Sequence, residues 1–177
     1  MAVRRIVIYG DPILRRQTAP VEQITAETRD LVDDMIDTMY EAEGIGLAAP
    51  QVGEPVAVCI VNMGLIHDDD SDPRAYINPE ILAEEGTCTM EEGCLSIPDI
   101  REDVTRPEAV TVRYQDLEGQ VHEERVDGLL ARVLQHEIDH LNGVLFIDRI
   151  SPIKRKLLSK KLKRLAAESQ SYIPSTG

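Results

Sequence analysis

The amino-acid sequence predicts a single domain of the α+β class. Strand-like patterns occupy the middle of the chain and helix-like patterns its two flanks, without a regular alternation of strand and helix. The 177 residues, of which 42% are hydrophobic, suffice to bury one core, and no internal repeat interrupts them. Three cysteines are too few for a disulfide scaffold, which favours a reducing compartment.

Two helices are predicted from the spacing of apolar residues. In Thr25–Ala42 the apolar side chains recur on one helical face, and Thr25 is a suitable N-cap. The second helix has Asp127 as its expected N-cap and continues through Leu141, where an Asn-Gly pair ends it. Its many apolar positions predict a buried helix.

Short strands are predicted from runs of β-branched and apolar residues that are bounded by turns. Residues 110–126 alternate between apolar and polar and turn near the middle, which is the pattern of a hairpin. The expected strands cover residues 6–8, 56–62, one or two segments within 75–90, 110–114, 121–126 and 144–147, with a surface loop at 68–73.

Charge is distributed unevenly along the chain. Residues 1–150 contain 12 arginines, no lysine and 31 acidic residues, a net charge of −19, whereas residues 151–177 carry a net charge of +6. Ser151-Pro152 begins a predicted basic helix whose apolar stripe is Ile153, Leu157, Leu158, Leu162 and Leu165. This helix is either simply solvated or the contact site of a separate partner. The lysine-poor, acidic body also suggests adaptation to a salt-rich cytoplasm.

Several classes of function and location are disfavoured by the same composition. Strong acidity of the body argues against DNA binding. No apolar run approaches the roughly 20 residues of a membrane span. The N-terminal residues have neither the apolar stretch of a signal peptide nor the composition of a transit segment, so we expect a cytoplasmic protein.

The sequence His136-Glu137-Ile138-Asp139-His140 predicts a metal site. Two histidines four residues apart share one face of a helix, so both imidazoles can bind one cation. Glu137 lies beside the first of them and can accept a proton from a bound water. The alternative is a helix with two ordinary polar residues. The neighbouring apolar positions argue against it, because an imidazole pair without a partner is costly in a core.

A catalytic metal site usually needs a third protein ligand. No histidine or cysteine follows residue 140, so the ligand is expected upstream, at Cys94. Gly93 precedes it and permits a close approach of the backbone. Cys88 and the downstream Asp148 are the competing candidates, whereas Cys59 is expected to be a core residue.

Three segments together resemble the motifs of the bacterial-type, metal-dependent peptide deformylases. They are Gly-Ile-Gly-Leu-Ala-Ala-Pro-Gln at residues 44–51, Glu-Gly-Cys-Leu-Ser at 92–96 and His-Glu-Ile-Asp-His at 136–140. Every defined position matches, and the motifs occur in the family's order. The resemblance implies curved antiparallel β-sheets packed around a central metal-binding helix, with an N-terminal and a C-terminal helix. We expect a catalytic domain at 1–150, with the basic helix and tail at 151–177 belonging to it.

The resemblance also implies the reaction, which is removal of the N-formyl group from the N-terminal formylmethionine of newly made polypeptides, with release of formate. Metal-bound water would attack the formyl carbon, with Glu137 as general base and then general acid. The side chain of Gln51 and the backbone N–H of Leu95 would stabilise the oxyanion. The implied ligands of one divalent ion, Fe(II) in the cell, or Zn(II) or another ion, are Cys94, His136 and His140.

In the family the peptide lies in the cleft as an added strand. The matching positions for backbone contacts are Ile45, Gly46 and Gly93. The methionine side chain would enter an apolar pocket, and Arg101 would border the cleft. The pocket residues are expected to be Ile45, Leu129, Val133 and His136, although plain core packing is the alternative for each leucine and valine.

Two further expectations concern the surroundings of the site and the tail. Arg106 is expected to pair with Glu92 and fix the cysteine loop, and Asp139 either supports the site or caps the helix. In related bacterial enzymes a C-terminal helix contacts the ribosome, so the basic tail here predicts a similar attraction to rRNA phosphate.

Three alternatives compete with this interpretation. A zinc endopeptidase would need a downstream third ligand. A structural metal site would have four protein ligands and no need for Glu137. A deformylase-like protein without activity would have an altered motif, and none is altered here.

Overall fold

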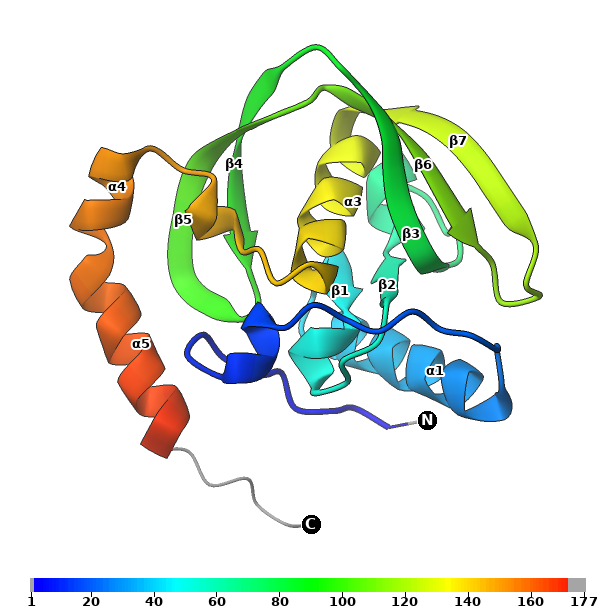
Figure 1. Cartoon of the computed structure of the whole chain (residues 1–177), viewed down its shortest axis with the longest axis horizontal. Helices are drawn as coiled ribbons and strands as arrows, with labels where there is room; N and C mark the ends of the chain where they lie inside the picture. The colour runs from blue at the N-terminus through cyan, green and yellow to red at the C-terminus, as the bar shows by residue number, and fades with distance from the viewer. Residues whose placement is uncertain (1, 172–177) are drawn as a thin grey trace.

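A computed structural model of the chain describes residues 2–171 and shows a sheet and a hairpin on either side of one central helix, α3 (Gly128–Leu141) (Figure 1). The sheet has five antiparallel strands in the order β1-β2-β3-β6-β7, and β4 and β5 form the separate hairpin. The strands are β1 Gly46–Ala48, β2 Val58–Val61, β3 Arg74–Glu85, β4 Cys88–Cys94, β5 Ile97–Arg106, β6 Ala109–Gln115 and β7 Val121–Asp127. The predicted α+β class is therefore confirmed.

The remaining helices lie outside this centre. They are α1 Ala26–Glu41, α2 Met63–His67, α4 Pro152–Leu157 and α5 Ser159–Ser171, with short 3-10 turns at Pro12–Arg15, Ala49–Val52 and Phe146–Asp148. The predicted first helix is confirmed, and Thr25 forms a reciprocal capping box with Thr28. Among residues 2–171, no helix has both the length and the apolar character needed to cross a bilayer.

The sheet curves because β3 is irregular. Its register against β6 shifts between Ile77 and Glu80 and again between Ile81 and Ala83. Asn78 adopts a left-handed backbone (φ 52°), and its side chain bonds the backbone of Val21 in both directions, at 2.7 and 2.8 Å. The bend in β3 is thereby held by a loop that is distant in sequence.

Two predicted strands are absent among the described residues. Residues 6–8 make no ladder, because Val7 N–H donates to Gln51 O (2.7 Å), in a 3-10 turn, and Tyr9 N–H to Ser96 O (2.8 Å), in the turn between β4 and β5. Residues 144–147 turn instead, since the Asp148 carboxylate accepts the N–H of Leu145 at 2.9 Å. β-branched composition alone therefore overstated the strand content.

The C-terminal segment forms two short helices where one was predicted. Ser151 caps α4 as expected, but this helix ends with Leu158 as its C-cap, and α5 begins at the next residue. Leu162 is buried, with Leu158 and Leu165 packed beside it, whereas Ile153 and Leu157 are 75% and 78% exposed. The predicted apolar stripe is therefore wrong for α4. Residues 172–177 of the expected tail lie outside the described residues.

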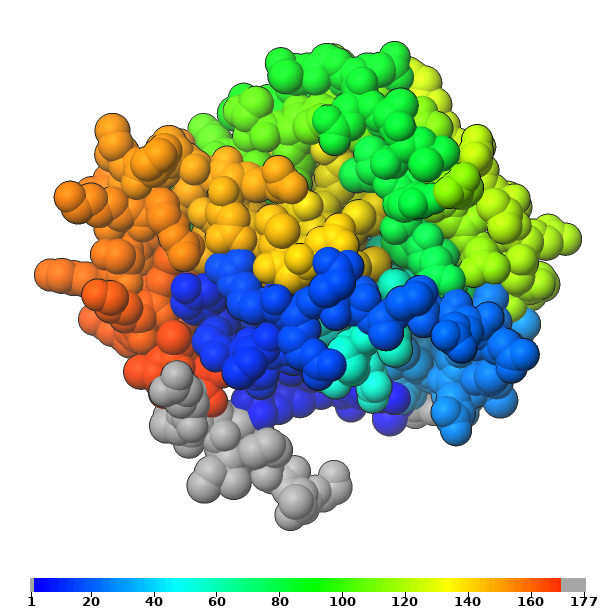
Figure 2. Space-filling view, viewed as in Figure 1, coloured from blue at the N-terminus to red at the C-terminus, as the bar shows by residue number. Residues whose placement is uncertain are grey.

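The N-terminal segment lies against the C-terminal helix, as Figure 2 shows. A Cβ added at Gly10 would come within 2.6 Å of the backbone of Ala166, so the two segments touch closely. Within the described residues the core consists of three apolar clusters. Each cluster is contacted by a different residue at or near the Cys94 loop: the first by Ile45, the second by Leu95 and the third by Cys94. The Cys94 loop therefore lies where the three clusters converge.

Candidate metal centre

Three potential ligands meet between the hairpin and the central helix. Cys94 ends β4, while His136 and His140 lie one turn apart on α3. One ligand atom of each lies within 4.8 Å of the others, and Cys94 Sγ is 3.3 Å from His140 Nε2. Around a tetrahedral ion with bonds of about 2.0–2.3 Å, ligand atoms lie about 3.3–3.8 Å apart. The three atoms are therefore close to the spacing that such an ion requires.

The competing third ligands lie elsewhere. Cys88 is not part of this group, which is the one group of its kind within residues 2–171. Asp148 is held by Arg15, with contacts of 2.5 and 3.1 Å, and by the N–H of Leu145. Cys59 is fully buried in β2, as expected for a core residue. Of the candidates from the sequence, the structure brings only Cys94 to the two histidines.

The His136 ring is held by a carboxylate on the side away from Cys94. His136 Nδ1 lies 2.9 Å from Glu92 Oε1, which leaves Nε2 to face Cys94. Burial would lower the pKa of His136, but contacts with Cys94 and Glu92 raise it above the usual value. Burial lowers the pKa of His140, which favours the neutral ring that binds metals. The buried Nδ1 of His140 has no hydrogen-bond partner.

Glu92 is the centre of a buried ionic network. It accepts two hydrogen bonds from Arg106, at 2.6 and 3.0 Å, and one from Arg132, at 2.7 Å. Burial would raise the pKa of Glu92, but its bonds with His136 and Arg106 lower it well below the ordinary value. The expected pair of Arg106 with Glu92 is confirmed.

Asp139 extends the network along α3. Its carboxylate accepts hydrogen bonds from Arg106 (2.8 Å) and from Arg149 (2.5 and 2.8 Å). Asp139 was expected either to support the site or to cap the helix, and its side chain supports the site.

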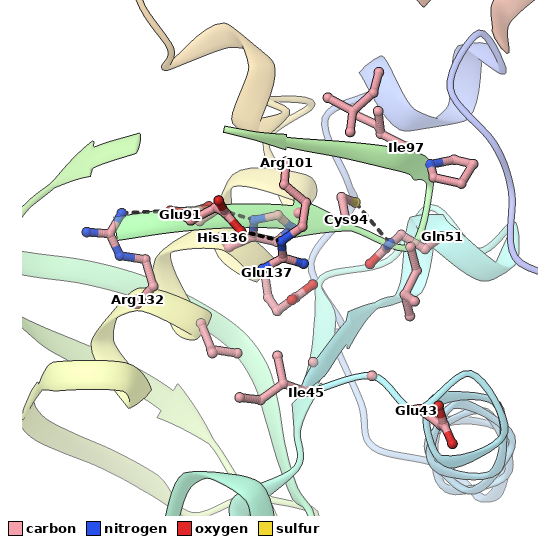
Figure 3. Close-up of a pocket in the computed structure, with 18 of the residues that line it drawn as sticks. Glu43, Ile45, Gln51, Glu91, Cys94, Ile97, Arg101, Arg132, His136 and Glu137 are labelled. Atoms are coloured by element: carbon pink, nitrogen blue, oxygen red, sulfur yellow. Dashed lines mark hydrogen bonds and ion pairs between the residues drawn. The ribbon is translucent and has the colours of Figure 1, made fainter. Parts of the chain in front are cut away.

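Glu137 faces the cavity in front of the ligands (Figure 3). It is buried, its Oε1 has no hydrogen-bond partner, and burial raises its pKa to about 7. A Cβ at Gly46 would lie 2.6 Å from Glu137 Oε2, so only glycine leaves room for the carboxylate there. An unpartnered carboxylate with this pKa is suited to accept a proton near neutral pH.

The Gln51 amide points toward Cys94 (Figure 3). Its Oε1 accepts the N–H of Ala48 at 3.0 Å, which fixes which end of the amide is the donor. Its Nε2 lies 3.6 Å from Cys94 Sγ and 3.1 Å from Ser96 Oγ. The amide N–H group is therefore directed at the metal site by the fold.

A cavity of about 610 Å³ opens beside these groups. Leu95 lines it. All of the predicted substrate contacts line it as well: Ile45, Gly46, Gly93, Arg101, Leu129 and Val133. Arg101 also binds Glu91 at 2.8 Å. Sequence reasoning missed Glu43, Asp99 and Arg132, which line the cavity too. The position of Arg132 could have been predicted from the sequence, because it lies four residues before His136 and therefore on the same face of the helix.

Comparison with known proteins identifies close relatives. The sequence pattern of the family described as Polypeptide deformylase matches residues 3–156. The peptide deformylase of Rhodopseudomonas palustris (strain BisA53) is 50% identical over 99% of this chain and 98% of that protein. That of Afipia carboxidovorans is 52% identical over 94% of this chain and 97% of that protein.

Solved structures give the same result. A peptide deformylase from Legionella pneumophila has a TM-score of 0.85 at 41% identity, covering 97% of this chain and 100% of that one. The enzyme from Thermus thermophilus has a TM-score of 0.86 at 40% identity, covering 94% of this chain and 99% of that one.

Proposed function

This chain belongs to the polypeptide deformylase family, and on that basis we propose how its residues remove the N-formyl group from the starting methionine of new polypeptides. The proposal assigns a role to each group at the metal centre. Its main support is the convergence of Cys94, His136 and His140 beside the Glu137 carboxylate, whose buried Oε1 has no hydrogen-bond partner.

Cys94, His136 and His140 would hold one divalent ion per chain. Fe(II) is the ion that we propose for the cell, with Zn(II) or another divalent ion as the alternative, because one thiolate and two imidazoles suit either. Such an ion, when bound, lowers the pKa of a coordinated water and polarises a carbonyl oxygen. The donor set fits, because three protein ligands are what a catalytic site that keeps a water usually has, and Cys94 and His136 line the cavity.

Glu137 is the proposed general base and general acid. Its carboxylate takes the proton of the attacking water and passes it to the nitrogen that leaves when the formyl C–N bond breaks. Burial raises its pKa above the ordinary value for a glutamate, which helps the carboxylate to hold the proton that it takes before it passes that proton on. Formate and a free N-terminal amine are the products.

Two donors would stabilise the oxyanion that develops on the formyl group. One is the Gln51 amide, whose orientation is fixed by its bond with Ala48 N–H. The other is the backbone N–H of Leu95, which follows Cys94 in the chain and lines the cavity. Donors fixed in advance need no rearrangement during the reaction.

The substrate would lie along the cavity as an added strand. The backbone of Ile45, Gly46 and Gly93 is proposed to bind the peptide, and Arg101 to border it. The methionine side chain would rest on Leu129 and Val133, which lie one turn apart on α3. We propose that the site near Gly46 also excludes groups larger than formyl; even a Cβ on Gly46 itself would meet Glu137 Oε2 at 2.6 Å and Val133 Cγ1 at 2.9 Å.

Formate release tests the function directly. The protein is purified without oxygen, its metal content is measured, and formate is assayed with a formyl-Met tripeptide. We expect release by the wild type and its loss in Glu137→Ala with the metal retained. Normal release by Glu137→Ala would contradict the mechanism, and caseinolytic activity of Cys94→Ser would favour an endopeptidase.

We also propose that the basic helices contact the ribosome in the cytoplasm. Exposed lysines on α5 form a positive surface that suits rRNA phosphate: Lys160, Lys161 and Lys163. Changing all three to glutamine should abolish cosedimentation with ribosomes and leave formate release from the tripeptide intact. Unchanged cosedimentation of this variant would overturn the ribosome contact alone.

A further inference from the structure

Arg132 is buried against the hairpin that carries the cysteine. It lies on α3, one turn before His136, and is 6% exposed (Figure 3). Its guanidinium donates to Glu92 Oε2 at 2.7 Å and to two backbone carbonyls, Val104 O at 2.9 Å and Cys88 O at 2.7 Å. Arginine is almost never this buried unless it is paired. All three of its acceptors lie on the two strands of the hairpin.

These bonds complete the surroundings of Glu92. Oε1 faces His136 Nδ1 and Arg106 Nη2, and Oε2 faces Arg106 Nε and Arg132 Nη1. A carboxylate has about four lone-pair sites, so every site is occupied and the group cannot rotate without breaking a buried bond. The carboxylate that orients His136 is therefore itself immobilised, and Arg132 contributes one of the four contacts.

The position of Arg132 also relates the two elements that supply ligands. Glu92 and Cys94 are two residues apart on β4, and Arg132 and His136 are four apart on α3. Arg132 and His136 thus bind the same carboxylate from consecutive turns of the helix. The Arg132–Glu92 contact thereby fixes β4, with its thiol, at a set position along α3, with its imidazoles.

We propose that Arg132 is a positioning residue for the metal centre, acting through Glu92 on the His136 ring and on the placement of the Cys94 strand. This inference rests on the proposed function of Cys94, His136 and His140 as ligands. Two alternative roles for Arg132 compete with this one. It lines the cavity, so it could bind the peptide, or it could contribute only to general stability.

The test compares Arg132→Met with a matched control on the same helix. Gln135 is also buried on α3 and donates to Pro107 O at 2.9 Å and to Ala131 O at 3.1 Å, but no hydrogen bond joins it to Glu92. Gln135→Met therefore removes a buried polar contact of α3 without touching the network. Arg132→Lys keeps the charge and, with a single point of attachment, only part of the bonding.

Each protein is loaded with Co(II), and three quantities are measured: the rate of Co(II) loss to a chelator, the visible Co(II) spectrum, and kcat and KM for formate release. We expect Arg132→Met to lose Co(II) about tenfold faster, the lower end of what outer partners of metal ligands contribute. Its Co(II) bands should shift, and kcat should fall with KM within twofold. Arg132→Lys should lie between it and the wild type, and Gln135→Met should match the wild type in all three.

Three results would overturn the proposal. They are Co(II) loss from Arg132→Met at the wild-type rate, a raised KM with unchanged kcat, which would assign Arg132 to peptide binding, and equal effects of Gln135→Met and Arg132→Met. If Arg132→Met fails to fold, Arg132→Lys decides by the same measurements. A wild type that binds Co(II) but releases no formate would instead overturn the proposed function, while metal loss and the spectrum still report on Arg132.

Discussion

A single methyl group at Gly46 tests whether the position of Glu137 matters for catalysis. In Gly46→Ala the new Cβ would lie 2.6 Å from Glu137 Oε2, 3.1 Å from Glu137 Cδ and 2.9 Å from Val133 Cγ1. Ordinary contacts begin at 3.4 Å, so the carboxylate must move by about 0.8 Å, and a displacement near 1 Å costs about 10²-fold in rate. Gly46 does not have a positive φ, so the effect is steric.

The assay is kcat/KM for formate release, with metal content and thermal stability measured on the same samples. We expect a loss of about 10²-fold with full metal occupancy, and a destabilisation of about 1–3 kcal/mol from overpacking. Wild-type kcat/KM in Gly46→Ala would refute the reasoning that Glu137 must occupy its observed position.

Three further predictions concern the network, the C-terminal helix and pH. Arg106→Ala should accelerate metal loss and lower activity together, and full metal retention would contradict the role of its pair with Glu92. Leu162→Ala should lower the free energy of unfolding by about 2–5 kcal/mol in urea titrations, because Leu162 is 3% exposed, whereas Leu157→Ala, 78% exposed, should change little. Burial would raise the pKa of Asp148, but hydrogen bonds from Arg15 and the Leu145 N–H lower it. The stabilisation that the charged Asp148 gives to the folded state is present above about pH 4, and it is lost as the pH falls through the lowered pKa. Asp148→Asn should therefore differ most from the wild type above pH 4, and a difference that grows as the pH falls below 4 would refute this.

The sequence was most informative where the structure depends on local interactions. Helix α1 follows from its apolar spacing and the Thr25 cap, and the β6–β7 hairpin from alternation around a turn. The strand predicted at residues 6–8 was wrong because the acceptors of Val7 and Tyr9, on Gln51 and Ser96, are brought there only by the fold. Periodicity carries no information on such distant partners.

The candidate site shows the same division. The two histidines were predicted from their spacing, and Cys94 was preferred to Cys88 because a glycine precedes it, a choice that the order of the motifs supported. Arg132 was missed because an arginine on a helix usually reaches solvent, and nothing near it in sequence indicates its acceptors. Those acceptors lie 28 to 44 residues away on β4 and β5.

The buried network explains why charged groups occupy a position that apolar side chains could fill. Removing ions from water is expensive, and well-packed apolar residues of similar volume are often as stabilising as a buried ion pair. Stability therefore gives no reason for Glu92 and Arg106, which are 6% and 3% exposed, to be charged. An apolar side chain at residue 92 could fill the space, but it could not accept a hydrogen bond from His136 Nδ1, now 2.9 Å from Glu92 Oε1. The charged network therefore serves to orient one imidazole ring. We expect single changes in the network to impair metal retention and also to lower the free energy of unfolding, because removing one partner leaves a buried charge unpaired.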